Sequence, residues 1–292
     1  MNRLIRQSLP VAIALPLLAC SPPQDDASHA TSFDIVFIRY AADGGDLFLL
    51  DLNDNAVRQL SDTAASEEFP VWSPDGTRIA FLSVQDERIT VQIMDVASEE
   101  VTSSIADITE PVAWSGDSAR LVTTKDVGDS RGLWTHSLAD GSQSPVGTGA
   151  SRDAYATWSP AEDRLAFEST RDGNPEIYAA GVDGSNVVRL TDNEVLDEWP
   201  QWSNSGEFIA YASGVEGDKD LWVMRADGSE KRQLTQDALF GDAYPSWSPD
   251  DKSLLITVQT SDTTTMLVLV DATNGEYREL VQGAAASWRA AR

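Results

Sequence analysis

The amino-acid sequence predicts an all-β fold, a six-bladed β-propeller whose blades are four-stranded antiparallel sheets. The first observation is a tryptophan that recurs every 41 to 45 residues, which is the length of one propeller blade. The second is that the segments between turns show the period of strands, not the three-and-four spacing of helices. The third is that the two ends of the chain supply complementary parts of one blade. The repeated residues are Trp72, Trp114, Trp158, Trp202, Trp247 and Trp288.

Residues 1–19 have the features of a bacterial lipoprotein signal peptide. Arg3 and Arg6 precede an apolar stretch that is too short to span a bilayer, and the only cysteine, Cys20, ends the sequence LLAC. This sequence resembles a lipobox, in which cleavage precedes the cysteine and the cysteine carries the lipid. Cys20 is therefore the expected lipidation site, and Ser21 after it favours the outer membrane. The alternative is an ordinary signal peptide with an incidental cysteine.

Residues 20–32 are expected to form a lipidated tether, because they are polar, contain prolines and show no periodicity. Residues 33–292 are expected to form the propeller. With the anchor at Cys20, the sequence predicts an outer-membrane lipoprotein of the cell envelope that faces the periplasm. Its attachment to the membrane would then come from the lipid.

Each repeat predicts four consecutive strands. In the repeat around Trp72, these are residues 67–73, 77–83, 88–96 and 99–105, and Ser-Pro-Asp-Gly at 73–76 has the residues that a type I turn prefers. The second strands carry apolar residues on both faces, which predicts sheets packed between neighbouring sheets. Several fourth strands carry basic residues, which is typical of an outer edge protected against pairing with other chains.

The strands at the two chain ends are expected to close the ring. The sequence FDIVFIRY at residues 33–40 matches a second strand but has no tryptophan strand before it. The segment 284–290 around Trp288 matches a first strand that lacks the other three. We therefore expect the C-terminal strand to join the N-terminal blade, which removes the free edges of an open array.

The repeats resemble those of a known family. The combination of WSPDG, the sequence RDGNPEIY at 171–178, the DGS turns and RLT at 189–191 is similar to the WD-like propeller repeats of the TolB family, over residues 33–289. The resemblance implies a six-bladed propeller that faces the periplasm and binds other proteins. TolB itself has an additional N-terminal α/β domain and no lipid anchor, so its role in the Tol-Pal assembly is not carried over.

The sequence contains no recognisable catalytic motif and predicts that the protein is not an enzyme. It has only two histidines, whereas oligogalacturonate lyases use a histidine-rich metal site. His29 lies in the tether, and His136 is expected to pack between blades. Residues 51–62 lack the glycine of a calcium loop, where Ala56 stands, and are interpreted as a hairpin. The alternative function is a lyase or hydrolase that acts on envelope glycans through carboxylates and a metal.

The net charge limits the class of partner. The chain has 47 acidic and 21 basic residues, a formal net charge of −26 at pH 7. Such a surface repels phosphates, so nucleic acid is not expected as a partner. Basic proteins, cations and neutral glycans remain possible, as does a charge that only keeps the surface solvated.

The loops on one face are long and varied, which indicates the binding face of a repeat protein. Acidic residues precede each repeated tryptophan except Trp288 by four or five positions, and aromatic residues precede four of them by three. The acidic residues are Glu67, Glu68, Glu110, Asp153, Asp197, Glu198 and Asp242. The aromatic residues are Phe69, Tyr155, Trp199 and Tyr244.

Because these residues precede the innermost strand of each blade, we expect them around one mouth of the central channel. The predicted function is a lipid-anchored scaffold whose acidic mouth binds a basic peptide segment of an envelope protein or a divalent cation, with apolar contact from the aromatic rings. No other cofactor is expected. The alternative is that the carboxylates are solvated loop ends and the aromatic rings pack between blades.

Overall fold

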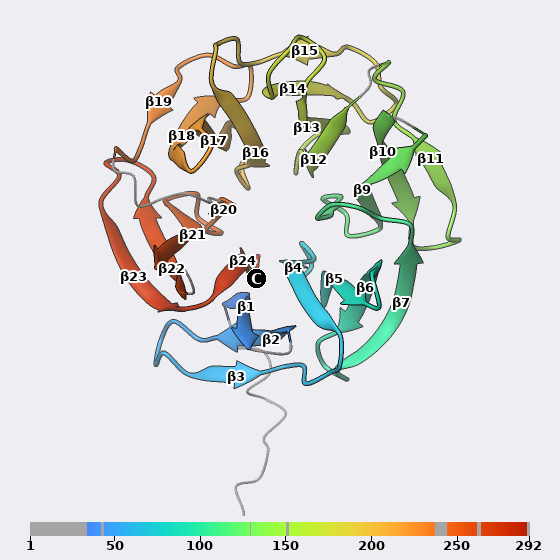
Figure 1. The fold of residues 1–292 in the computed structure, drawn as a ribbon, viewed down its shortest axis with the longest axis vertical. Helices are drawn as coiled ribbons and strands as arrows, with labels where there is room; N and C mark the ends of the chain where they lie inside the picture. Colours follow the sequence, from blue (N-terminus) through green and yellow to red (C-terminus); the bar gives the residue numbers. More distant parts are fainter. Residues whose placement is uncertain are drawn as a thin grey trace, which may run out of the picture.

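The computed structural model describes residues 34–41, 44–128, 130–149, 152–236, 244–261 and 264–290. They form six four-stranded antiparallel sheets around a central axis, so the predicted six-bladed β-propeller is confirmed (Figure 1). Cys20, the tether and Asp242 lie outside the described residues. Among the residues described, none belongs to a helix long and apolar enough to cross a membrane.

Each blade is numbered here by the order of its strands along the chain, and blade 1 contains the first and the last described strands. Blade 1 consists of β24 (Ala284–Trp288), β1 (Ile35–Ala41), β2 (Gly44–Leu50) and β3 (Val57–Gln59). Blade 2 consists of β4 (Ser66–Trp72), β5 (Arg78–Gln85), β6 (Arg88–Asp95) and β7 (Glu100–Ala106). Blade 3 consists of β8 (Ala113–Trp114), β9 (Arg120–Val127), β10 (Ser130–Ser137) and β11 (Gln143–Pro145).

The other three blades repeat this order without a break in the chain. Blade 4 consists of β12 (Asp153–Trp158), β13 (Arg164–Ser169), β14 (Glu176–Gly181) and β15 (Val188–Arg189). Blade 5 consists of β16 (Leu196–Trp202), β17 (Phe208–Val215), β18 (Asp218–Arg225) and β19 (Arg232–Gln233). Blade 6 consists of β20 (Ser246–Trp247), β21 (Ser253–Ser261), β22 (Thr264–Asp271) and β23 (Tyr277–Gln282).

The C-terminal strand closes the ring as expected. β24 pairs antiparallel with β1, with Trp288 opposite Ile35, and it lies beside β1 near the centre of the view (Figure 1). Ser287 Oγ also accepts a hydrogen bond from the backbone N–H of Trp72 in blade 2, at 3.2 Å. On the other side, the N–H of Trp288 donates to Ser246 Oγ of blade 6 at 3.3 Å. One short strand therefore connects three blades.

The apolar core lies between the blades, because both faces of each sheet are covered. In one buried cluster, Trp72 and Ile79 of blade 2 pack with Val36 and Leu49 of blade 1. The other blade interfaces are built in the same way, and this explains the apolar residues on both faces of the second strands. Each repeated tryptophan thus packs between two blades, five of them buried and Trp288 half-buried. The burial of such a side chain contributes about 25 cal/mol per Å² of apolar surface.

The turn between the first and second strands of blade 2 is closed by the hydrogen bond expected of the predicted type I turn. In blade 2, the N–H of Gly76 donates to the carbonyl of Ser73 at 2.8 Å, and Gly76 has a φ of +66° that favours glycine. Asp75 Oδ1 accepts a hydrogen bond from the backbone N–H of Thr77 at 3.0 Å. Behind this turn, the guanidinium carbon of Arg78 lies 4.8 Å from the ring centroid of Trp114 in the next blade. Such a cation–π contact contributes about 0.5–1 kcal/mol to the blade interface.

The structure also bears on two other expectations from the sequence, the hairpin after β2 and the packing of His136. The segment after β2 is a hairpin turn, in which the N–H of Asp51 donates to the carbonyl of Ala56 at 2.9 Å. His136 is 2% exposed, and its Nε2 lies 2.7 Å from Thr123 Oγ1. Burial, together with nearby Lys125, lowers the pKa of His136 to about 4, so its imidazole is neutral at pH 7.

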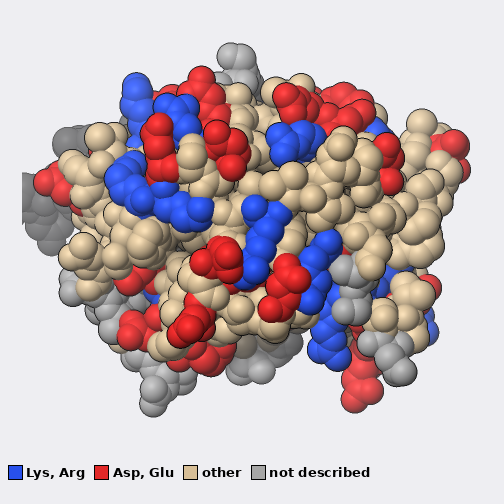
Figure 2. Space-filling view, turned by 90° about the horizontal axis from the view of Figure 1, so that it is seen from above, with Lys and Arg blue, Asp and Glu red and all other residues tan. Residues whose placement is uncertain are grey.

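The outer rim carries the fourth strands, of which β3, β15, β19 and β23 contain basic residues. Arg189 of β15 pairs with Glu176 and Asp192, each at 2.9 Å. Figure 2 shows one side of the ring, on which Lys and Arg side chains alternate with Asp and Glu and form no large patch of one sign. Charged residues on these outer strands oppose pairing with the strands of other chains.

Candidate functional site

The aromatic residues expected at the channel mouth sit at a break in the innermost strands. Phe69, Tyr155 and Trp199 have φ values of 49°, 49° and 54°, and the strand pairing shifts register at each of them. Ala285 occupies the same position in blade 1 with a φ of 45°. A bulge of this kind redirects a side chain out of the sheet, and a bulky residue in the left-handed region costs about 1–3 kcal/mol. Such strain is a reason to look for a function at this level of the channel.

The four aromatic rings come together although they belong to different blades. The ring centroids of Trp199 and Tyr244 are 4.6 Å apart, and those of Phe69 and Tyr244 are 5.0 Å apart. Tyr155 meets Trp199 edge-on at 6.3 Å. All four side chains remain half-buried, so the rings form a cluster with a surface that a ligand can reach. The structure therefore brings the predicted aromatic residues together.

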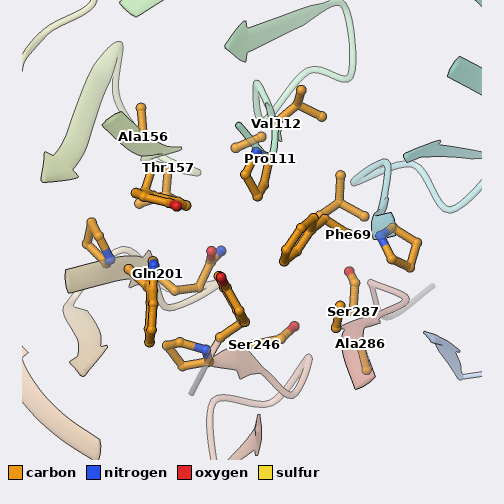
Figure 3. A pocket seen from close by; sticks show the side chains of 18 residues that line it. Phe69, Pro111, Val112, Ala156, Thr157, Gln201, Ser246, Ala286 and Ser287 are labelled. Atoms are coloured by element: carbon orange, nitrogen blue, oxygen red, sulfur yellow. The ribbon is translucent and has the colours of Figure 1, made fainter. Parts of the chain in front are cut away.

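Around these rings lies a cavity of about 120 Å³ on the channel axis, and side chains from all six blades point toward it (Figure 3). Every blade contributes three consecutive residues, and none of the 18 is charged. A cavity of about 150 Å³ is large enough to bind benzene, so this one matches a single apolar side chain. The residues at the level of the rings are Phe69, Pro111, Tyr155, Trp199, Tyr244 and Ala285.

Three acidic residues that lie five positions before a tryptophan fall within the described ranges, and all three are buried in contacts between strands and loops. Glu67, Asp153 and Asp197 are 2%, 0% and 0% exposed. Glu67 accepts a hydrogen bond from Ser61 Oγ at 2.9 Å, and Ser61 Oγ in turn accepts from the N–H of Leu47 in blade 1 at 2.8 Å. Glu67 therefore ties blade 2 to blade 1, and it does not stand in an open ring of carboxylates.

The other two buried carboxylates also bind groups inside the protein, although Asp197 Oδ1 is buried without a hydrogen-bond partner in the described part of the chain. Arg171 Nη2 lies 2.9 and 3.1 Å from the two carboxylate oxygens of Asp153. Asn193 Nδ2 donates to Asp197 Oδ2 at 2.8 Å. Burial raises the pKa of Asp197 and of Glu67 above the usual carboxylate range, in each case partly offset by hydrogen bonds.

The acidic residues four positions before the tryptophans lie closer to the rings. Glu110 pairs with Arg131 and accepts a hydrogen bond from the Tyr155 hydroxyl, whose pKa is raised by burial and by Glu110. Glu198 pairs with Lys219 at 2.9 Å, and the Lys219 ammonium lies 4.7 Å from the Trp199 ring centroid. The structure therefore places Glu110 and Glu198 in ion pairs beside the aromatic cluster.

Glu68 completes the set of expected acidic residues that the structure describes. It is half-buried and lies 3.5 Å from Ser66 Oγ, and burial raises the pKa of its carboxyl. Within the described ranges, no group of three or more His, Cys, Asp or Glu side chains is placed to hold a metal ion.

The expected set of mouth residues does not include Glu168, Arg131 and Lys219. Glu168 lies on β13, ten positions after Trp158, and the same position holds Leu82 in blade 2 and Ala212 in blade 5. A comparison of the repeats position by position would have singled out this glutamate. Arg131 and Lys219 would not have been found in this way, because their importance comes from the carboxylates that they meet in space.

Comparisons with known proteins agree with the fold. The family model described as TolB beta propeller domain matches residues 33–291. A protein named TolB homolog from Chlorobium luteolum is 26% identical over 147 residues, which is 50% of this chain and 33% of that protein. This chain thus spans about a third of the length of that curated relative.

Solved structures show the same architecture. TolB from Acinetobacter baumannii superposes with a TM-score of 0.78 at 19% identity, over 89% of this chain and 67% of that chain. The putative TolB from Agrobacterium tumefaciens gives 0.69 at 20% identity, over 86% and 89%. An oligogalacturonate lyase in complex with manganese gives 0.59 at 17% identity, over 87% and 75%. At these identities the likeness concerns the fold alone. The family match over residues 33–291 shows that this chain belongs to the TolB beta propeller domain family.

Proposed function

We propose that the protein is a binding scaffold of the cell envelope, which holds a segment of another protein at the aromatic mouth of its channel. One observation carries this proposal: Phe69, Tyr155, Trp199 and Tyr244 converge from four blades on an uncharged cavity of about 120 Å³. Clustered aromatic side chains beside a pocket are the common anchor points of protein–protein contacts.

The chemistry of the mouth suggests the character of the segment. One apolar side chain would enter the cavity, with contact from the rings. Carboxylates of Glu68, Glu110 and Glu198 lie near the rings, and the net charge of −26 attracts basic partners over a longer range. A segment that combines an apolar residue with basic neighbours would satisfy both features.

The sequence and the family support a proposal for the location. We propose that Cys20 carries a lipid and that the tether 20–32 holds the propeller at the periplasmic face of the outer membrane. The support is the sequence LLAC before the tether and the similarity to proteins named TolB. In this arrangement the anchor lets the propeller reach envelope proteins while it stays bound to one membrane.

The test is affinity capture from detergent-solubilised envelope with three forms of the protein. Trp199→Ala removes the central ring, and alanine is compatible with the backbone there because Ala285 occupies the same position in blade 1. Lys252→Ala changes an exposed residue in the turn between β20 and β21 and serves as the control. We expect the same proteins to bind the wild type and Lys252→Ala and to be lost from Trp199→Ala. Equal capture by all three forms would exclude the aromatic mouth as the binding site.

A further inference from the structure

Glu168 faces the interface between blades 4 and 5. Along β13, Leu165 and Phe167 pack in the cluster shared with blade 3, whereas Ala166 packs with residues of blade 5. Successive side chains of a strand point to opposite faces, so Glu168 lies on the same face as Ala166. In the strand pairing it stands opposite Ala154, next to Tyr155 of the aromatic cluster.

The groups around Glu168 form a network with more carboxylates than cations. Glu110 comes from the segment before β8, Glu168 from β13 and Glu198 from β16, so three neighbouring blades each supply one carboxyl group. Arg131 of β10 pairs with Glu110, and Lys219 of β18 pairs with Glu198. Both cations thus already have a carboxylate partner. The carboxyl group of Glu168 is the third of the network, and no cation of the network is left to pair with it.

The carboxyl group of Glu168 is the unsatisfied member of this network. Its Oε2 is shielded from solvent and has no hydrogen-bond partner among the residues that the structure describes. Lys219, by contrast, has a side chain that is only 2% exposed and is held by Glu198 and Glu216. Within the described ranges, Glu176 Oε2 and Asp197 Oδ1 are also buried without a partner, but the second oxygen of each of those carboxylates accepts a hydrogen bond, from Arg189 and Asn193 respectively. A buried polar atom without a partner calls for a specific reason.

Packing does not require a carboxyl group at this position. The corresponding residues of the other blades are uncharged: Ile38, Leu82, Thr124, Ala212 and Thr257. Burial, followed by the nearby carboxylates of Glu198 and Glu110, raises the pKa of Glu168 to about 8, against the weaker opposite effect of Lys219 and Arg131. At pH 7 the group is therefore mostly neutral, and a further positive charge beside it would favour the anion.

We propose that Glu168 selects a cationic side chain of the bound segment, which it receives in exchange for its own proton. The inference rests on the proposed function, because it assigns the charge of the segment held at the mouth. In the free protein the carboxyl group keeps its O–H bond. When a guanidinium or ammonium group arrives beside it, that bond breaks, the proton passes to water, and the carboxylate forms an ion pair with the cation. The carboxylates of Glu110, Glu168 and Glu198 then face three positive charges, those of Arg131, Lys219 and the bound cation. Asp126 and Glu216, which also pair with Arg131 and Lys219, are mostly exposed to solvent.

The experiment follows the titration of Glu168 directly. Carboxyl carbons are labelled with ¹³C, and the Glu168 signal is identified by its absence in Glu168→Gln. The probe is Nα-acetyl-argininamide, whose only charge is the guanidinium, and the control probe is neutral Nα-acetyl-glutaminamide. Without probe, we expect the titration of the Glu168 carboxyl group to have its midpoint near pH 8. With the arginine probe the midpoint should fall by at least about one pH unit, and with the glutamine probe it should not move.

Binding of the arginine probe supplies the second measurement. Because only the anionic carboxylate forms the ion pair, affinity should fall more than about tenfold from pH 8 to pH 6. Glu168→Gln should lose this pH dependence, and so should Glu168→Ala, which reproduces the residue of blade 5. Glu194→Gln removes an exposed carboxylate from the loop before β16 and should behave as the wild type.

The outcomes separate this inference from the proposed function. A Glu168 midpoint that stays unchanged with the arginine probe, or equal binding of that probe by Glu168→Gln, overturns the inference. Neither result depends on envelope capture. Trp199→Ala can therefore lose its partners even if Glu168 has no role. Equally, Glu168 can respond to the arginine probe even if Trp199→Ala keeps its partners.

Discussion

The rings of Trp199 and Tyr244 lie 4.6 Å apart, centroid to centroid, although they belong to blades 5 and 6 and are 45 positions apart in the chain. The two residues occupy equivalent places in successive repeats. Their contact therefore comes from the closure of the ring, which brings the same position of every blade to one level of the channel. The following predictions test the anchor, the closure of the ring and the site that this closure creates.

The first prediction concerns Cys20. Replacement Cys20→Ser should abolish labelling of the protein with fatty acid and release it from the membrane fraction, because the chain would lose its acyl anchor. Labelling of cells with a palmitate analogue, followed by fractionation, measures both effects. Continued acylation of Cys20→Ser would refute the lipoprotein interpretation.

The second prediction concerns the closure of the ring. Deletion of residues 284–292 removes β24, which hydrogen-bonds to blades 1, 2 and 6. A loss of about 4 kcal/mol or more is expected, which corresponds to a fall in melting temperature of about 10 °C. Deletion of residues 290–292 alone leaves β24 intact and is the control. If both truncated proteins melt like the full chain, β24 does not close the propeller.

The third prediction concerns His136 in acid. Its folded-state pKa of about 4 lies below the ordinary value of 6.5, so the unfolded chain binds more protons between these values. The stability contributed by the buried neutral imidazole is complete above pH 6.5 and is lost as the pH falls toward 4, by up to about 3 kcal/mol. Urea unfolding at pH 7 and pH 4.5 should show a smaller loss for His136→Gln than for the wild type. The same loss in both proteins would contradict the assignment.

The fourth prediction concerns Glu168 and has the opposite sign. Its folded-state pKa of about 8 lies above the ordinary value of 4.5, so the folded protein binds more protons between these values and loses stability as the pH rises. Glu168→Gln should be as stable as the wild type near pH 4.5 and more stable at pH 8.5, by up to about 4 kcal/mol. Urea unfolding at both pH values measures this difference. A variant that is less stable at pH 8.5 would show that the ionised carboxylate is favourable in the fold.

The fold could be predicted from the sequence because it depends on features that recur. Turn residues such as Gly76 indicate local structure. Strand order is indicated by the spacing of the tryptophans and by the missing first strand of blade 1. The placement of Glu67, Asp153 and Asp197 could not be predicted, because their burial depends on partners such as Ser61, Arg171 and Asn193 in other strands and loops. The left-handed backbone at Phe69 was likewise not expected within a segment interpreted as a regular strand.

The candidate site was predicted in part for the same reason. The aromatic residues share a position in the repeat, so the symmetry of the ring determines that they meet. The ion pairs of Glu110 with Arg131 and of Glu198 with Lys219 join residues at different repeat positions, and they follow only from the packing of side chains.

The central claim is that the aromatic mouth of the channel holds a segment of a partner protein. The most direct measurement places a photo-reactive benzoylphenylalanine in living cells at Tyr244, and separately at Lys252 as the control. Illumination should give a discrete cross-linked product of higher mass from position 244 and none from position 252. Substitution Trp199→Ala in the same chain should remove that product. The absence of any product from position 244, or the same product from both positions, would contradict the account.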